Sequence, residues 1–152
     1  MKGCVGVATY RGLIFNILFI DYENLVYLVR LRMSLFERLG GEAAISTAVD
    51  IFYKKMLSDG RVKDFFAQTD MERQISRQKH FLMMVTGGPN HYEGKSMRDA
   101  HKHLVTKGLS DLHVDVVIEH LGATLRELGA KEGDIAEVAA LANSVRDDVL
   151  NR

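Results

Sequence analysis

The sequence predicts an all-α fold from residue 33 onward. Apolar residues recur at helical spacing, and no stretch alternates apolar and polar residues as a strand does. Glycine pairs and Ser-x-x-Glu sequences separate the apolar runs, as helix ends and starts do. The 152 residues are 47% hydrophobic and 26% charged, with a single proline, which is typical of one globular domain. We expect about six helices joined by short loops.

Residues 1–32 differ from the rest and are expected to form an N-terminal extension outside the domain at residues 33–152. They hold none of the six histidines, and their apolar run Gly12–Ile20 is shorter than the roughly 20 residues that span a bilayer. Several interpretations stay open. The extension is a tail translated from an early start (Met33 resembles a first residue), a signal peptide without a small-x-small cleavage site, a helix before the domain, or a membrane-surface stretch that includes the apolar Leu25–Leu31.

The predicted elements follow in order. The capping box Ser34-Leu35-Phe36-Glu37 begins a short helix, and Gly40-Gly41 ends it. A second box, Thr69-Asp70-Met71-Glu72, begins a later helix, and Gly87-Gly88-Pro89-Asn90 breaks the chain after it. The longer helices are expected at Glu42–Leu57, Glu72–Thr86, Ser96–Thr106, Ser110–Leu128 and Asp134–Asn151, with the pair Phe65-Phe66 in the segment Arg61–Ala67.

Composition excludes several classes of function. Lys and Arg together number 20, as do Asp and Glu, so the net charge is +0 and no basic face for nucleic acid is indicated. The single cysteine, Cys4, excludes an internal disulfide and a multi-cysteine metal site. It fits a reducing compartment, and we expect a cytoplasmic protein.

Polar residues on apolar helix faces give the first functional signal. Gln74 and Gln78 stand one turn apart in the apolar stripe of Glu72–Thr86, and Tyr53 stands on the apolar face of Glu42–Leu57. A buried amide or phenol needs a hydrogen-bond partner. Two interpretations remain open: these side chains reach water at the edge of the stripe, or they line a cavity and donate hydrogen bonds to one polar guest.

His101 lies in the apolar stripe of Ser96–Thr106, between Met97 and Leu104. It is either a hydrogen-bonded core histidine or a metal ligand. No cysteine or second histidine stands four residues away on that helix, which argues against a zinc site with local ligands. A single inward histidine fits haem iron, which takes one proximal imidazole from the protein.

Short motifs that extend from Ser34 to Arg152 point to a family. They are Leu39-Gly40-Gly41, Phe52-Tyr53, Phe65-Phe66, Asp70-Met71 with Gln74, Gln78 and Lys79, Phe81-Leu82, Gly87-Gly88, Tyr92 to Lys102, Gly108-Leu109 and Ala123-Thr124-Leu125. Together they are highly specific. This part of the chain resembles the truncated haemoglobins of group I, and most closely their cyanobacterial branch.

The resemblance implies a two-over-two helical sandwich around haem, with His101 as the proximal ligand of the iron. Tyr53, Gln74 and Gln78 would form a distal hydrogen-bonding cluster. The remaining residues implied at the cofactor are Phe52, Phe66, Phe81, Met97 and Leu104 around the porphyrin, with Arg77 and Lys79 as candidates for the propionates.

Two positions depart from some cyanobacterial relatives. Those relatives carry an iron-binding histidine where Arg77 stands, and a protonated guanidinium only donates hydrogen bonds. Some also join a histidine of the last helix covalently to a haem vinyl, but Asp134–Arg152 holds no histidine. We therefore expect haem b held non-covalently and no internal sixth ligand from Arg77.

The resemblance also implies reversible binding of dioxygen, with nitric oxide and carbon monoxide as further ligands. Two hydrogen bonds of about 1–3 kcal/mol each would slow dioxygen release by roughly 30- to 10⁴-fold. Such slow release suits chemistry on bound dioxygen better than delivery, and the resemblance implies that this chemistry is dioxygenation of nitric oxide to nitrate, served by an unknown reductase. The alternatives are oxygen binding, storage or sensing without turnover, and a haem-free helical interaction module. We expect a monomer.

Overall fold

The computed structural model describes residues 26–27, 29 and 32–152, and the chain divides into two units after Met33. The signal-peptide prediction and the apolar run Gly12–Ile20 lie outside the described residues. Of the stretch Leu25–Leu31, the residues described are Val26, Tyr27 and Val29, which are helical and exposed. Among the helices described, none combines the length and the apolar character that crossing a bilayer requires.

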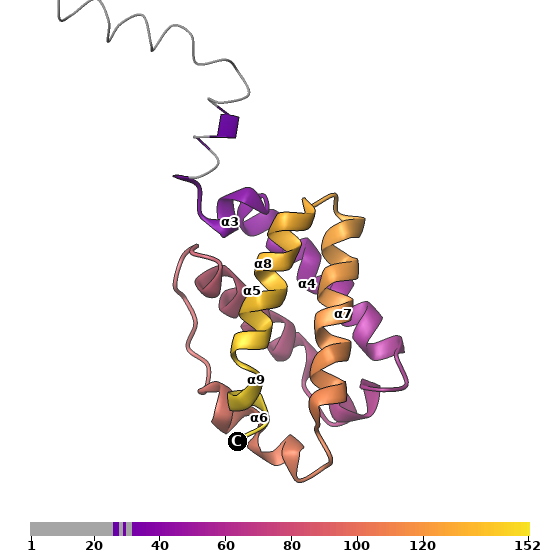
Figure 1. Ribbon diagram of the computed structural model, residues 1–152. Helices are drawn as coiled ribbons and strands as arrows, with labels where there is room; N and C mark the ends of the chain where they lie inside the picture. Colours follow the sequence, from indigo (N-terminus) through magenta and orange to yellow (C-terminus); the bar gives the residue numbers. More distant parts are fainter. Residues whose placement is uncertain (1–25, 28, 30–31) are drawn as a thin grey trace, which may run out of the picture. The chain divides into compact units, whose positions relative to one another are not determined.

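Residues 34–152 are built from helices, as Figure 1 shows. The described elements of this unit, in chain order, are α3 (Leu35–Arg38), α4 (Gly41–Ser58), the 3-10 helix η1 (Lys63–Phe66), α5 (Met71–Val85), α6 (Met97–Val105), α7 (Asp111–Glu127), α8 (Glu132–Ser144) and α9 (Arg146–Val149). The all-α prediction is confirmed.

The helices form two packed pairs. α4 packs against α5, α7 packs against α8, and α4 also contacts α7 (Figure 1). The centre between the pairs is filled from α4 by a buried apolar face, with Met83 of α5 and Val116 of α7 packed against it. The α4 residues of this core are Ile45, Val49, Phe52, Tyr53 and Met56. This arrangement agrees with the predicted two-over-two sandwich.

Side-chain caps fix where the helices begin. The Ser34 hydroxyl accepts from the Glu37 backbone N–H at 3.3 Å, and the Glu37 carboxylate accepts from the Ser34 N–H at 2.8 Å. The predicted capping box of α3 is therefore present. α5 differs from its prediction, because its N-cap is Asp70, which accepts from the Arg73 N–H at 3.2 Å, and not Thr69.

The turn after α5 brings α3 close to the core. The Phe36 N–H donates to the Thr86 carbonyl at 2.8 Å, and Gly87 takes a left-handed conformation with φ of +87°. A Cβ on Gly88 would stand only 2.5 Å from the Phe36 ring. The glycine pair is thus required by close packing as well as by the turn.

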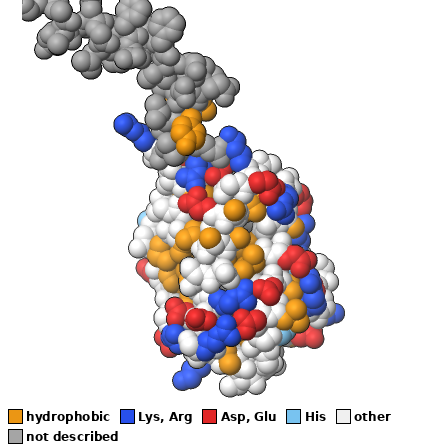
Figure 2. Space-filling model, in the orientation of Figure 1, with side chains coloured by type: hydrophobic (Ala, Val, Ile, Leu, Met, Phe, Trp, Pro, Cys, Tyr) orange, Lys and Arg blue, Asp and Glu red, His pale blue; other side chains and the backbone are white. Residues whose placement is uncertain are grey.

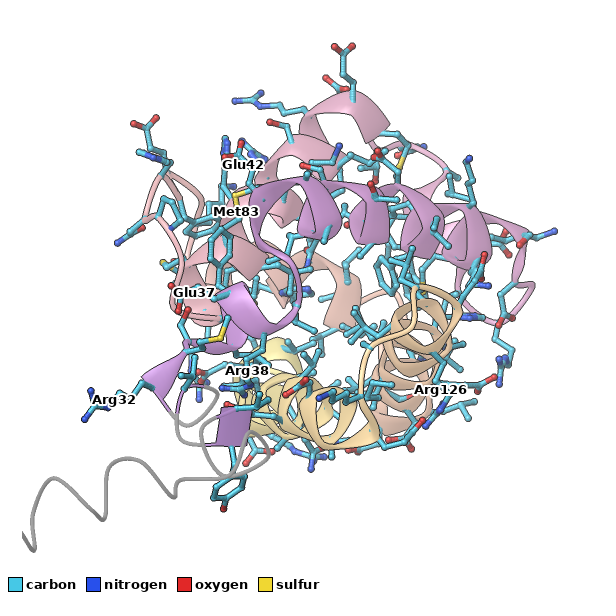
Figure 3. All side chains as sticks on the ribbon, turned by 90° about the horizontal axis from the view of Figure 1, so that it is seen from above. Arg32, Glu37, Arg38, Glu42, Met83 and Arg126 are labelled. Atoms are coloured by element: carbon cyan, nitrogen blue, oxygen red, sulfur yellow. The ribbon has the colours of Figure 1, made fainter. Side chains whose placement is uncertain are left out.

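α3 is also tied to α8. The Arg38 guanidinium, which is labelled in Figure 3, donates to the buried Asp134 carboxylate at 2.8 Å and pairs with Glu137. Because Asp134 is 5% exposed, this ion pair supplies a charged partner that a buried carboxylate needs.

The last predicted helix was wrong in its bounds. The helix expected at Asp134–Asn151 begins at Glu132 and is divided at Val145 into α8 and α9. Near the break the Ser144 hydroxyl donates to the Leu141 carbonyl at 2.7 Å, and polar side chains of this kind compete with helical hydrogen bonds. The segment Arg61–Ala67, for which no element was predicted, contains the short 3-10 helix η1.

Candidate functional site

Tyr53 and Gln74 meet between α4 and α5. The Gln74 side-chain amide donates to the Tyr53 hydroxyl at 3.0 Å, and Tyr53 is only 3% exposed. α5 begins after the Asp70 cap, and Gln74, one turn into the helix, lies on the side that faces α4. The two polar groups on apolar helix faces therefore converge.

Burial controls the charge of Tyr53. Loss of solvent raises its pKa to about 12, and the hydrogen bond from Gln74 opposes that rise. The phenol is therefore neutral at physiological pH. Since its oxygen accepts from Gln74, and no described residue accepts its proton, the hydroxyl retains a proton to donate.

Two aromatic rings pack against the Tyr53 ring. The rings of Phe52 and Phe66 stand edge-on to Tyr53, with centroid distances of 5.1 Å and 5.8 Å. Such edge-to-face contacts restrict the orientation of the phenol. Two of the side chains expected to contact a porphyrin thus adjoin the Tyr53 ring.

The remaining predicted residues of α5 have different surroundings. Gln78 is half-buried one turn beyond Gln74 and has no hydrogen-bond partner among the described residues. Phe81 is half-buried and stacks edge-on against Tyr92, with a centroid distance of 5.4 Å. Lys79 lies 2.9 Å from the Asp50 carboxylate of α4, and Arg77 is exposed and unpaired within the described residues.

His101 is oriented by the backbone of its own helix. Its Nδ1 donates to the Met97 carbonyl at 2.8 Å, which leaves Nε2 as the nitrogen with a free lone pair. Burial lowers the imidazole pKa, and the Met97 hydrogen bond opposes that effect. A neutral imidazole whose other nitrogen is hydrogen-bonded is the form in which histidine binds metal.

α6 presents an apolar face that the protein covers only in part. Met97, His101 and Leu104 share this face and are half-buried, and no residue of α6 is buried. In α5 the only buried residue is Met83, although Ile75, Phe81 and Leu82 lie on its apolar side. One neutral imidazole and two apolar helix faces are a donor set and a surface that suit haem. The residues present therefore fit that cofactor.

Sequence reasoning assigned no role to two residues near this site. Asp50 holds the Lys79 ammonium, and the two are far apart in the sequence. Tyr92 covers Phe81, and its hydroxyl donates to the Lys95 carbonyl at 2.9 Å. The close approach of Gly94, where a Cβ would stand 2.1 Å from the Tyr92 ring, is visible only in the fold.

Comparison with known proteins identifies the family. Residues 34–151 match the family of bacterial-like globins. A group 1 truncated haemoglobin of Tetrahymena pyriformis is 49% identical over 119 residues, which are 78% of this chain and 96% of that protein. A group 1 truncated haemoglobin of Synechocystis sp. is 49% identical over 122 residues, covering 78% of this chain and 98% of that protein.

Solved structures give the same result. The Fe(III) form of the Tetrahymena pyriformis truncated haemoglobin superposes with a TM-score of 0.74 at 49% identity, over 78% of this chain and 98% of that one. The 2/2 haemoglobin of Synechococcus sp., solved in the cyanomet state with covalently attached haem, superposes with a TM-score of 0.75 at 47% identity, over 79% of this chain and all of that one. The chain belongs to the group 1 truncated haemoglobins.

Proposed function

We propose that the chain binds haem b through His101 and holds dioxygen reversibly with the help of Tyr53, Gln74 and Gln78, and that it thereby supports the conversion of nitric oxide to nitrate. When bound, haem supplies an iron that takes diatomic gases as ligands. Overall, nitric oxide, dioxygen and one electron combine to give nitrate. The electron comes from a reductase partner.

The hydrogen bond between Gln74 and Tyr53 carries this proposal. It occupies the phenol oxygen as an acceptor, and the raised pKa of Tyr53 keeps the phenol proton in place. Tyr53 would thus hold a proton that it can donate to a ligand that carries partial negative charge. Retention of dioxygen gives nitric oxide time to react.

Gln78 and the basic residues complete the proposed site. Gln78 has an amide without a partner among the described residues and offers a second donor. Arg77, which is exposed, and Lys79, which exchanges Asp50 for a carboxylate of the cofactor, would hold the propionates. Carbon monoxide is a further ligand, but a weaker acceptor.

The mode of attachment follows from the sequence of the last two helices. Residues 132–152 contain no histidine, so the haem is held without a covalent bond from α8 or α9. Extraction with acidified butanone should move all of the haem into the organic layer. Haem that stays with the protein would contradict non-covalent binding.

The proposal includes the cellular compartment and the oligomeric state of the protein. A lone cysteine, Cys4, offers no internal disulfide, which suits the cytoplasm, where reductases are available. We propose a monomer there, since all the residues of the proposed site come from one copy of the chain.

Stopped-flow mixing of the oxygenated protein with nitric oxide tests the function. We expect about one nitrate per haem in a single turnover, and continued turnover when a reductase and its electron donor are added. Nitric oxide that is bound without nitrate formation would leave oxygen binding, storage or sensing as the function. A protein purified without a Soret band would instead indicate a haem-free helical module.

A further inference from the structure

The helix that carries His101 depends on one neighbour for its position. α6 packs mainly against α9, and none of its residues is buried. Its apolar face alone therefore fixes α6 weakly. The residues from 146 to 152, which we call the clamp, supply a set of polar contacts on both sides of His101.

A left-handed residue gives the clamp its shape. Asn151 has φ of +56°, its N–H donates to the Asp148 carbonyl at 3.2 Å, and the Arg152 N–H donates to the Asp147 carbonyl at 3.0 Å. These two bonds form a Schellman motif that ends α9. Asparagine is among the few residues that tolerate this conformation.

The clamp contacts the first turn of α6 at Arg98. The Arg98 guanidinium lies 2.8 Å from the Asp148 carboxylate and donates to the Arg152 carbonyl at 3.0 Å. In the opposite direction the Asn151 amide donates to the Arg98 carbonyl at 3.1 Å. The backbone and the side chain of Arg98 are thus both held.

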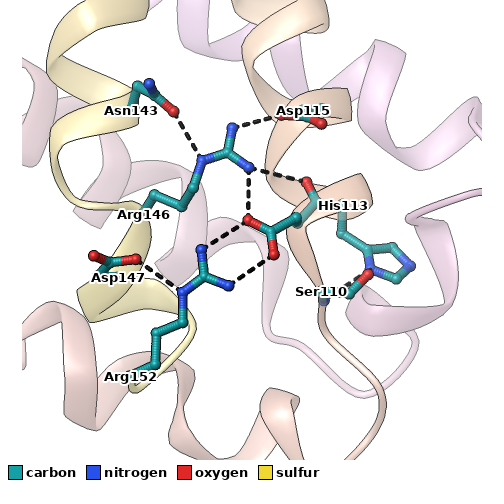
Figure 4. A network of polar contacts seen from close by, with 8 residues as sticks. Ser110, His113, Asp115, Asn143, Arg146, Asp147 and Arg152 are labelled. Atoms are coloured by element: carbon teal, nitrogen blue, oxygen red, sulfur yellow. Dashed lines mark hydrogen bonds and ion pairs between the residues drawn. The ribbon is translucent and has the colours of Figure 1, made fainter.

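The clamp also grips the start of α7, as Figure 4 shows. The Arg152 guanidinium donates to both oxygens of Asp111, at 2.8 Å and 3.0 Å, and Arg146 donates to the same carboxylate at 3.0 Å. Arg146 also pairs with Asp115. These arginines lower the pKa of Asp111, and Arg152 has the larger effect. In Figure 2, acidic and basic side chains are interspersed at the end where α6 and α9 lie.

In the sequence, His101 lies between Arg98 and Asp111, two residues that the clamp contacts. Residues 98 and 111 bound a segment that contains α6 from its second residue onward and the loop after it, and the clamp connects both ends of that segment. Connecting the ends of a flexible segment reduces its conformational freedom. We infer that Arg98, Asp111, Asp148 and Arg152 are positioning residues, which hold α6 so that the His101 imidazole meets the haem iron. The inference rests on the proposed role of His101.

A charge-reversal cycle on the haem-loaded protein tests this role. Arg98→Asp sets two carboxylates against each other, and adding Asp148→Arg restores an ion pair of opposite direction. We expect the single variant to lose haem to an acceptor apoglobin about two- to fivefold faster than wild type, and the double variant to recover most of the loss. The iron–imidazole stretching band of the ferrous protein should shift in the single variant and return in the double variant.

The pair formed by Arg126 and Glu132 provides the matched control. Its atoms lie 2.7 Å apart and its side chains are 57% and 69% exposed, against 2.8 Å and about half-exposed side chains for Arg98 and Asp148. Arg126, labelled in Figure 3, pairs with Glu132 and thereby joins α7 to α8. Neither residue of this pair belongs to α6. Arg126→Asp should leave haem loss and the stretching band as they are in wild type.

Amide hydrogen exchange measures the effect of the clamp on α6 independently of haem loss. Arg98→Asp should raise exchange of residues 98–111 about two- to fivefold while Arg126→Asp does not. Equal effects of the two variants on exchange and haem loss would overturn the inference, as would an increase in exchange with no change at the haem. His101→Ala distinguishes the proposed function from the positioning role of the clamp. If that variant keeps its haem spectrum, the proposed function is wrong. If it loses haem and Arg98→Asp has no effect, only the positioning role of the clamp is wrong.

Discussion

The Gln74 amide donates a hydrogen bond of 3.0 Å to the hydroxyl of Tyr53, and this bond joins α5 to α4 at the core of the domain. It gives the buried phenol the partner that it needs, and it leaves the phenol proton available. One contact therefore stabilises the helix pair and prepares a donor for a ligand. The predictions below separate these two effects.

Replacing Tyr53 with phenylalanine should speed dioxygen dissociation by about tenfold or more, because it removes a donor worth about 1–3 kcal/mol with little change of shape. Dissociation of carbon monoxide should change far less, since that ligand carries little negative charge. Stopped-flow rates for both gases measure the effect. Equal dioxygen rates in variant and wild type would show that the Tyr53 hydroxyl does not reach the ligand.

A double-mutant cycle isolates the contact between α4 and α5. Gln74→Leu and Tyr53→Phe should show a coupling of about 1 kcal/mol in the free energy of unfolding, because each removes one partner of a partly buried hydrogen bond. Gln78→Leu is the control, since Gln78 is an amide one turn along that makes no hydrogen bond to Tyr53 among the described contacts. Comparable coupling for Gln78 would contradict a specific Gln74 contact.

Local patterns predicted most of the fold. The Ser34 capping box, the break at Gly87-Gly88 and the helical spacing of α4, α5 and α7 depend on neighbouring residues, and the sequence displays them directly. The division between α8 and α9 was not predictable, because Arg146 at that point is held by Asp111 and Asp115 of α7. Contacts between residues so far apart in the sequence depend on the tertiary fold.

The site divides in the same way. The sequence singled out Tyr53, Gln74 and His101 because a polar group on an apolar helix face needs a hydrogen-bond partner or a ligand. The structure brings the first two together. The pairing of Lys79 with Asp50 could not be foreseen, because both are ordinary charged residues, the first half-buried and the second exposed. Surface charges give no comparable signal in a sequence.

His101→Ala should abolish stable haem binding. The Met97 carbonyl orients the His101 ring, and α6 offers no second imidazole on its apolar face, since His103 is exposed. The measurement is the ratio of Soret to protein absorbance after reconstitution with haem. Adding imidazole to the variant should restore part of the ferrous spectrum, whereas unchanged haem content without imidazole would rule out His101 as the ligand.

Gly88→Ala should lower the free energy of unfolding by about 1–3 kcal/mol, because the new methyl would overlap the Phe36 ring. The control is Gly133→Ala in α8, where a Cβ meets nothing within 4 Å. That change should be neutral or should stabilise by about 0.5–1 kcal/mol, as alanine favours a helix. Urea unfolding of both variants decides the matter, and equal stability of the two would contradict close packing at Gly88.

Alkaline pH should destabilise the domain through Tyr53. Its pKa is raised by burial from about 10 to about 12, so between these values the unfolded chain loses the phenol proton while the folded chain retains it. The contribution of Tyr53 is therefore complete below about pH 10 and falls as pH rises toward 12, by up to about 3 kcal/mol. Tyr53→Phe removes this group, so the stability of the variant should decline less steeply over that interval. Urea unfolding of wild type and variant at closely spaced pH values gives the difference between the two curves. Parallel curves would show that the phenol ionises as easily in the folded protein as in the unfolded chain, and the proposed donor would then lose the burial on which its retained proton depends.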